Sequence, residues 1–154
     1  MFGTVTPTYL FGPCATGVYT IPAAYSNVKA VYTNTAPVDA YRGAGRPEAT
    51  YTIERLVEKA AMELGIDKTE IRMKNFPTEF PFKQTLVHTV DSGDYVAGLE
   101  KAKQMADYEG FSARRKKSEA NGKLRGIGVS SYFEACGIAP SAAVMSLGCG
   151  VGLW

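Results

Sequence analysis

The sequence has few residues of the kinds that build a metal site or a disulfide framework. It contains one histidine, His88, and three cysteines, Cys14, Cys136 and Cys149, which form no Cys-x-x-Cys pair. An odd number of widely spaced cysteines argues against a disulfide framework and a zinc site, and it favours a reducing compartment. A histidine with no second ligand nearby predicts a surface or capping role for His88 rather than metal binding.

The sequence also lacks an excess of charge of either sign. The 17 Lys and Arg residues oppose 15 Asp and Glu residues, which gives a net charge of +2. This balance excludes the strong basic field of a typical nucleic-acid-binding domain. The Arg-Arg-Lys-Lys run at 114–117 is therefore interpreted as a solvated helix face, and we expect no nucleic-acid partner.

Charge is missing from both ends of the chain, since the first charged residue is Lys29 and the last is Glu134. A complete domain usually solvates its ends, so we interpret the chain as an internal piece of a larger protein. A small domain with uncharged edge segments is the alternative. Residues 135–154 are too rich in Gly, Ser and Pro for a membrane helix, and the N-terminus lacks the basic region and long apolar core of a signal peptide. We therefore expect no membrane span.

Apolar periodicity predicts a long helix over residues 48–64. Pro47 suits its first turn and Gly65 its C-terminal cap. Glu54 and Glu58 are expected on faces other than the apolar one. The apolar face carries six residues at helical spacing: Ala49, Ile53, Leu56, Val57, Ala60 and Leu64.

Three further helices are expected downstream. One begins after Asp67, which has capping-box spacing with Glu70, and ends near Asn75. The next follows a cap at Asp91 or Ser92. The last is the basic surface stretch 112–123, and residues 76–90 between the second and third helices are expected to form a loop.

Strands are predicted where β-branched residues alternate with others. These are residues 28–33, residues 38–41 and residues 124–136. Residues 1–27 show short β-type runs and no helical period. Helices and strands that do not alternate regularly indicate an α+β fold.

The best candidate site is the loop within AYRGAGRPEA, residues 40–49. A strand is expected to run into Gly43-Ala44-Gly45, and a helix begins directly after it. No Ser, Thr, Asp or Asn stands at the cap, so the loop amides should be open on one side to an anion or an oxo group. Arg42 and Arg46 add forked donors on either side. The alternative is a tight strand-to-helix turn with two surface arginines.

The residues around this loop resemble the large, molybdenum-cofactor-binding subunit of the xanthine dehydrogenase, aldehyde oxidase and aerobic carbon monoxide dehydrogenase family. The resemblance runs through VYTNTAPVDAYRGAGRPEATYTIERLVEKAAMELGIDKTEIRMKNF and continues through GKLRGIGVSSYFEACGIAPS. It implies an α+β fragment of the molybdenum-cofactor-binding domains. Residues 1–76 would end the first cofactor-binding segment, residues 77–122 would form a helical linker region, and residues 123–154 would start a truncated second segment.

The resemblance also implies the site and its cofactor. Tyr41, Arg42, Gly43, Ala44 and Gly45 would contact a molybdenum–pterin cofactor in its molybdopterin cytosine dinucleotide form. Carbon monoxide-oxidising members have a cysteine where Gly43 stands, which argues against carbon monoxide as the substrate. The family's glutamate base does not match any residue of this chain. Glu134 is instead expected to be a strand-end carboxylate bonded to backbone.

The partners implied are the rest of the large subunit, an iron–sulfur small subunit and an FAD-carrying medium subunit. The intact cytoplasmic enzyme would hydroxylate a small carbonyl, aldehyde or heterocyclic substrate, whereas this chain alone would be inactive. A different function remains open from the residues themselves. A stand-alone α+β module could use the Arg42–Arg46 loop to bind a generic anion or a partner.

Overall fold

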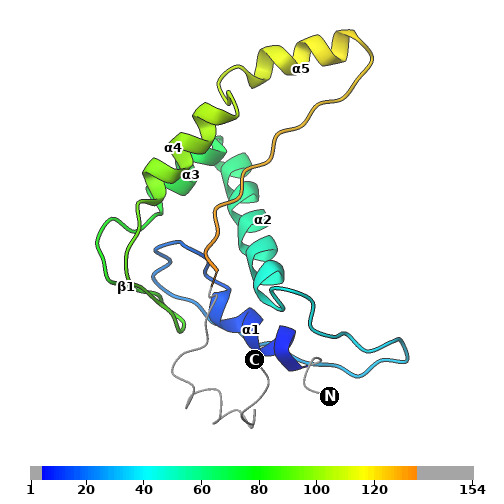
Figure 1. The fold of residues 1–154 in the computed structure, drawn as a ribbon, viewed down its shortest axis with the longest axis vertical. Coiled ribbons are helices and arrows are strands. Elements are labelled where there is room, and N and C mark those ends of the chain that lie inside the picture. Colours follow the sequence, from blue (N-terminus) through cyan, green and yellow to red (C-terminus); the bar gives the residue numbers. More distant parts are fainter. Residues whose placement is uncertain (1–4, 135–154) are drawn as a thin grey trace.

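The computed structural model describes residues 5–134. Its helices are α1 (Val5–Cys14), α2 (Arg46–Leu64), α3 (Lys68–Lys74), α4 (Tyr95–Met105) and α5 (Phe111–Ala120). Strands β1 (Phe82–Lys83) and β2 (Thr89–Val90) pair antiparallel, with Phe82 opposite Val90. The helices and this small sheet agree with the expected α+β class. Helix α5 stands apart at one end of the molecule, and the chain after it returns along α2 (Figure 1).

Helix α2 confirms the long predicted helix, and it begins two residues earlier than predicted. Gly45 precedes it without a side-chain cap, and Gly65 closes it in the left-handed conformation with φ 64°. The predicted apolar face is partly wrong. Glu54 is buried, whereas Leu56 and Leu64 are exposed. The inward face therefore holds a carboxylate that needs a partner.

The three shorter helices are confirmed, with changed boundaries for α4 and for α5, which covers Phe111–Ala120 rather than 112–123. The side chain of Asp67 caps α3 by accepting bonds from the backbone N–H groups of Thr69 and Glu70. Helix α4 is capped by Asp94 rather than by Asp91 or Ser92, because the carboxylate of Asp94 accepts a bond from the N–H of Ala97. Helix α5 has no buried residue, as expected of a solvated basic helix.

The N-terminal prediction is wrong, because residues 5–14 form helix α1. Apolar residues lie all around this helix, so its sequence shows no helical period. Packing of α1 against α2 overrides the β-type local preference of the segment.

The predicted strands 28–33 and 38–41 are absent, and so is a strand in the described part of 124–136, which ends at residue 134. A strand needs a neighbour to complete its backbone hydrogen bonds. None of these segments is paired with another described strand. They run as extended chain instead.

A small core joins the N-terminal segment to α2 and α4. Its buried members come from four parts of the chain: Val18, Tyr19, Ile53, Phe76 and Leu99. The rings of Tyr19 and Phe76 stack with centroids 5.8 Å apart. Val129 and Phe133 pack against this core from the returning segment, which is the chain after α5, residues 121–134. Within residues 5–134, no helix has both the length and the apolar character needed to cross a membrane.

Candidate functional site

The Gly43–Gly45 loop is a tight turn that leads directly into α2. Gly43 and Gly45 have φ values of 96° and 85°, a region in which residues with a side chain are strained. The N–H of Ala44 donates to the carbonyl of Tyr41 at 2.8 Å, and the N–H of Arg46 donates to the carbonyl of Gly43 at 3.2 Å. The sequence therefore uses glycine at two positions that the turn itself requires.

The expectation that all three loop amides are open is wrong for Ala44, since its N–H is bonded within the turn. The N–H groups of Gly43 and Gly45 differ from it, because neither donates to a residue of the part that the structure describes. The loop thus retains two donors next to the positive end of α2.

Gly45 also has a packing role that the sequence does not reveal. A Cβ atom at this position would lie 2.8 Å from the backbone nitrogen of Phe11 and 3.0 Å from Cβ of Leu10. Helix α1 therefore lies so close to the backbone of the loop that only glycine fits at position 45. One side of the loop faces this helix, which leaves the other sides to any ligand.

Tyr41 and Arg42 lie on the outside of the turn. The Tyr41 side chain is 88% exposed, and Arg42 is exposed as well. Among the described residues, the Arg42 guanidinium has no hydrogen bond or ion pair. Its five donors are therefore available to an anionic group brought to the loop.

Arg46 is not the surface arginine that the alternative of a simple turn with two surface arginines describes. Its Nε donates to the carbonyl of Gly43 at 2.8 Å and lies 2.7 Å from a carboxylate oxygen of Glu134. The Arg46 side chain is only 18% exposed. Glu134 was expected at a strand end with backbone partners, whereas its carboxylate forms this ion pair. The two residues tie the loop to the end of the returning segment.

His88 and Cys14 lie in contact with each other near this ion pair. His88 Nε2 lies 3.5 Å from Cys14 Sγ, and the imidazole ring packs edge-on against Phe133 with centroids 5.4 Å apart. His88 is thus half-buried rather than at the surface. Burial lowers its pKa below the ordinary 6.5. Burial also raises the pKa of the Cys14 thiol, so both groups are neutral near pH 7.

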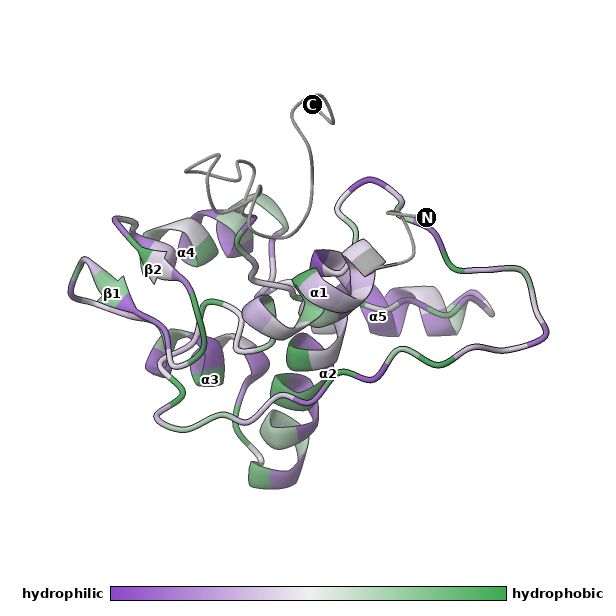
Figure 2. Cartoon of the chain, turned by 90° about the horizontal axis from the view of Figure 1, so that it is seen from below, coloured by the Kyte–Doolittle hydropathy of each residue, from purple (hydrophilic) through white to green (hydrophobic). Residues whose placement is uncertain are grey.

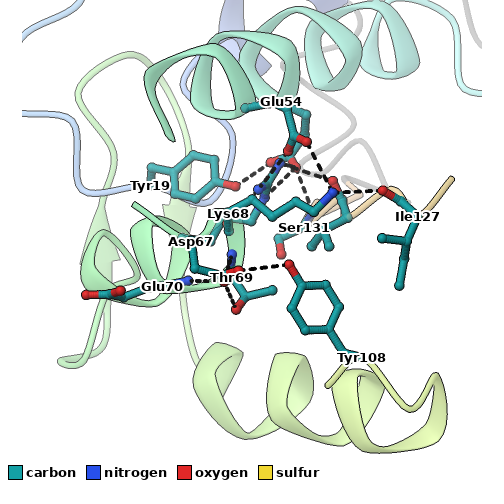
Figure 3. A network of polar contacts seen from close by, with 12 residues as sticks. Tyr19, Glu54, Asp67, Lys68, Thr69, Glu70, Tyr108, Ile127 and Ser131 are labelled. Carbon is teal, nitrogen blue, oxygen red and sulfur yellow. Dashed lines mark hydrogen bonds and ion pairs between the residues drawn. The ribbon is translucent and has the colours of Figure 1, made fainter. Parts of the chain in front are cut away.

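A buried polar network lies beside the middle of α2, at Glu54 and Glu58, and sequence reasoning missed it (Figure 3). The Arg72 side chain is fully buried, and its Nη2 lies 2.9 Å from Oε2 of Glu54. The hydroxyl of Tyr19 donates to the other oxygen of the same carboxylate. Burial and the bond to Glu54 both raise the pKa of Tyr19. Each charge of this pair therefore has partners that compensate for its removal from water.

The same network holds the returning segment in place. Arg72 Nη2 donates to the carbonyl of Val129 at 3.1 Å, and Lys68 Nζ donates to the carbonyl of Ile127 at 2.8 Å. The N–H of Ser131 donates to Glu54 at 3.1 Å. Side chains of α2 and α3 thus supply the backbone partners that a neighbouring strand would otherwise provide. The only sequence signal was Glu54 and Glu58 four residues apart on one helix, which is also typical of a solvated face.

The described residues contain no cluster of three or more His, Cys, Asp or Glu side chains that could hold a metal ion. The loop at Gly43–Gly45 offers hydrogen-bond donors instead. Its backbone amides and the Arg42 guanidinium suit the oxygens of an anionic or oxo group, since both are donors without acceptor capacity.

Comparison with known proteins also leads to molybdenum-cofactor-binding proteins. Residues 1–76 match the model of the molybdopterin cofactor-binding domain. The carbon monoxide dehydrogenase large chain of Hydrogenophaga pseudoflava is 41% identical over 152 residues, which cover 94% of this chain and 19% of that protein. The xanthine dehydrogenase molybdenum-binding subunit of Escherichia coli O157:H7 is 32% identical over 80% of this chain and 15% of its own length.

A solved structure has a similar fold. Quinoline 2-oxidoreductase from Pseudomonas putida 86 superposes with a TM-score of 0.77 and 34% identity, over 84% of this chain and 17% of that one. The chain thus spans less than a fifth of the length of these relatives. It belongs to the molybdenum hydroxylase family of xanthine dehydrogenase, aldehyde oxidase and carbon monoxide dehydrogenase large subunits, and it contains a molybdopterin cofactor-binding domain.

Proposed function

We propose that this chain forms part of the cofactor-binding surface of a molybdenum hydroxylase large subunit, with Tyr41, Arg42, Gly43, Ala44 and Gly45 against the cofactor. The observation that carries the proposal is the exposed Arg42 guanidinium beside the N–H groups of Gly43 and Gly45, all without described partners. These donors converge on one short turn at the start of α2. They fit the anionic and oxo groups of a molybdenum–pterin cofactor.

Each residue of the loop has a role in this proposal. Arg42 binds an anionic group of the cofactor through two parallel N–H donors. Gly43 and Gly45 donate backbone hydrogen bonds, and the glycine at 45 lets α1 hold the loop at a fixed place. Ala44 is buried and small, so the turn stays closed beneath the ligand. When bound, the molybdenum centre supplies the two-electron oxidation of the substrate carbon with oxygen derived from water.

The structure of the turn supports a substrate other than carbon monoxide. A Cβ atom on Gly43 would lie 2.9 Å from Cγ of Pro47, and the φ of Gly43 is 96°. A cysteine at this position would be strained in this turn. Because residue 43 is glycine, the chain lacks the thiol that carbon monoxide-oxidising members of the family carry at this place, and we propose a small aldehyde, carbonyl or heterocycle as the substrate class.

The complete enzyme in this proposal is a cytoplasmic complex. Its pterin carries a cytosine dinucleotide, and its electrons leave through an iron–sulfur subunit and an FAD subunit. The catalytic base in this proposal lies outside this chain, because no residue of the chain, Glu134 included, matches the family's glutamate base. We therefore expect the 154-residue chain alone to be inactive.

Metal and pterin analysis of the full-length large subunit tests the cofactor proposal. Arg42→Ala should lower molybdenum and pterin occupancy by about ten- to hundred-fold at limiting cofactor, since a charge-assisted hydrogen bond contributes about 1.5–3 kcal/mol. Arg42→Lys should recover only part of the loss, because an ammonium group has no planar fork.

Arg55→Ala is the matched control. Arg55 is an exposed arginine on α2 without a described partner, and its loss should leave occupancy unchanged. Normal occupancy in Arg42→Ala would remove that side chain from the proposal. A full-length protein that contains neither molybdenum nor pterin, and binds simple anions at the loop, would favour the anion-binding module.

A further inference from the structure

Residues 27–40 form an arm that extends away from the body of the protein. Every residue of the arm is exposed. In Figure 1 the arm projects from the region of α1 and returns to the start of α2, and Figure 2 shows the same projection from another side. The arm ends beside the candidate site, since Tyr41 is the next residue.

The main chain of the arm has almost no hydrogen-bond partners. No backbone–backbone hydrogen bond joins any residue of 27–40 to the described part of the chain. The N–H of Ala40 donates to the carboxylate of the preceding Asp39 at 2.6 Å, and Thr35 contacts the carbonyl of Ala36 at 3.5 Å. The remaining backbone groups are left for water or for another polypeptide.

The arm exposes large apolar side chains among its polar residues. Val31 is 76% exposed, Tyr32 is fully exposed and Val38 is 68% exposed. Figure 2 shows hydrophobic residues recurring along this projection. Lys29 and Asp39 are the only charged residues of the arm. Exposed strands in native proteins are normally protected by charges or by a covering element, and this arm has little of either.

We propose that the arm completes a β-sheet in the full-length large subunit, by pairing its main chain with an edge strand from the part of that subunit outside this chain. Residues 28–33 and 38–41 are the pairing segments, and Asn34 to Pro37 form the turn between them. This mode of recognition uses backbone hydrogen bonds for affinity and alternate side chains for specificity. The inference rests on the proposed function, because it takes the chain as part of a longer subunit.

The rest of the same large subunit is the favoured partner of the arm for two reasons. The carbon monoxide dehydrogenase large chain of Hydrogenophaga pseudoflava is about five times longer than this chain, which covers 19% of it, so other parts of one subunit make up most of the surroundings of the arm. The arm also carries one positive and one negative charge, which gives no basis for steering toward a charged separate protein. An interior position explains both the exposed valines and the missing charges.

Docking of the arm would also fix the candidate site. The carbonyl of Tyr41 accepts the N–H of Ala44, so the residue that follows the arm is bonded directly into the glycine turn. A strand held in a sheet at 38–41 would set the position of Arg42 and of the Gly43 amide. The arm is therefore a positioning element for the cofactor loop.

Hydrogen–deuterium exchange on the full-length subunit in its assembled complex tests this proposal. The alternate backbone amides of 28–33 and 38–41 that face the partner strand should exchange at least about 100-fold more slowly than those of an unstructured peptide of the same sequence, since hydrogen-bonded amides exchange through unfolding. Exposed amides at the two ends of α5 in the same sample should remain fast. Unprotected amides throughout 28–41 overturn the proposal.

A pair of proline variants separates strand pairing from simple burial. Val31→Pro removes a backbone donor within a pairing segment and should abolish protection across 28–33. Thr35→Pro lies in the turn, beside the natural Pro37, and should leave that protection intact. Equal effects of the two variants would contradict main-chain pairing.

Three further results would assign a different occupant and so overturn the proposal as stated. Protection that rises with protein concentration would indicate a second copy. Protection already present in dilute 154-residue chain would place the partner within residues 135–154. Protection that is lost when the other subunits are removed would place it on one of them. Molybdenum and pterin content, measured on the same samples, shows separately whether the proposed function holds.

Discussion

Arg46 and Glu134 are joined by an ion pair of 2.7 Å although 88 residues separate them in the sequence. Arg46 opens α2, and the same Nε also bonds to the carbonyl of Gly43. Glu134 ends the described part of the returning segment. The pair thus connects the candidate loop at Gly43–Gly45 to a distant part of the chain, and the position of the loop depends on both residues.

This connection predicts energetic coupling between the two residues. Arg46→Ala and Glu134→Ala should each lower the free energy of unfolding, and the double variant should lose less than the sum. We expect a coupling of about 0.5–1 kcal/mol, because both side chains are partly exposed and screened by water. Urea unfolding of the four proteins measures the cycle. Additive losses would show that the pair contributes nothing to stability.

Arg72 should be far more important for stability than an exposed basic residue. Arg72→Met leaves the carboxylate of Glu54 buried without its cation, which should cost about 3–5 kcal/mol. Lys74→Met is the control, since the Lys74–Glu70 pair is more than half exposed and should contribute less than about 1 kcal/mol. Urea unfolding gives both values.

A second variant keeps the Arg72 prediction testable if Arg72→Met does not fold. The double variant Arg72→Met with Glu54→Gln removes the uncompensated charge, so it should be more stable than Arg72→Met alone. A double variant that is less stable than the single one would contradict the buried ion pair as the cause.

His88 should make the protein less stable as the pH falls below about 6.5. Burial lowers its folded pKa, so between the folded pKa and the ordinary value the unfolded chain binds more protons than the folded one. Stability from this residue is complete above pH 6.5 and is lost as the pH falls through the folded pKa. Unfolding free energies at pH 5 to 8 should show this slope, and His88→Gln should lack it. The lowered pKa of Asp67 acts only near pH 4 and below.

Two glycine substitutions should have opposite signs. Gly45→Ala places a side chain against α1 at a φ of 85°, which should cost about 1–3 kcal/mol for the strained positive φ and more for the contact. Gly98→Ala lies within α4 with open space around it, and it should stabilise the protein by about 0.5–1 kcal/mol. Thermal unfolding compares them, and a neutral Gly45→Ala would mean that α1 does not approach the loop.

The sequence predicted those parts of the fold whose cause is local. Pro47, Gly65 and Asp67 act within one turn of the backbone they affect, so the bounds of α2 and the cap of α3 could be read from a few residues. The glycines of the candidate turn are local as well. Their positive φ values account for them without any ligand, which is why cofactor binding stays a proposal.

The parts that the sequence did not predict depend on residues far apart. Helix α1 forms against α2, and the returning segment is held by Arg72 and Lys68 rather than by a strand. A glutamate such as Glu54 is typical of a solvated helix face, and only the fold brings Arg72 and Tyr19 to it. The expected strands at 28–33 and 38–41 lacked a described partner for the same reason, since pairing is a property of two segments.

The bonds that hold residues 127–134 can form only late in the synthesis of the chain. Chains emerge from the ribosome with their N-terminal part first. The segments that carry Arg46, Glu54 and Arg72 can therefore begin to fold before Val129 and Glu134 have been synthesised. In that interval the carboxylate of Glu54 lacks the N–H of Ser131, and Arg46 lacks its carboxylate. A nascent chain that stalls before residue 127 would lack the bonds to Glu54 and Arg46, and its glycine turn would not be tied to Glu134. We expect chaperones and proteases to act on such an incompletely bonded chain.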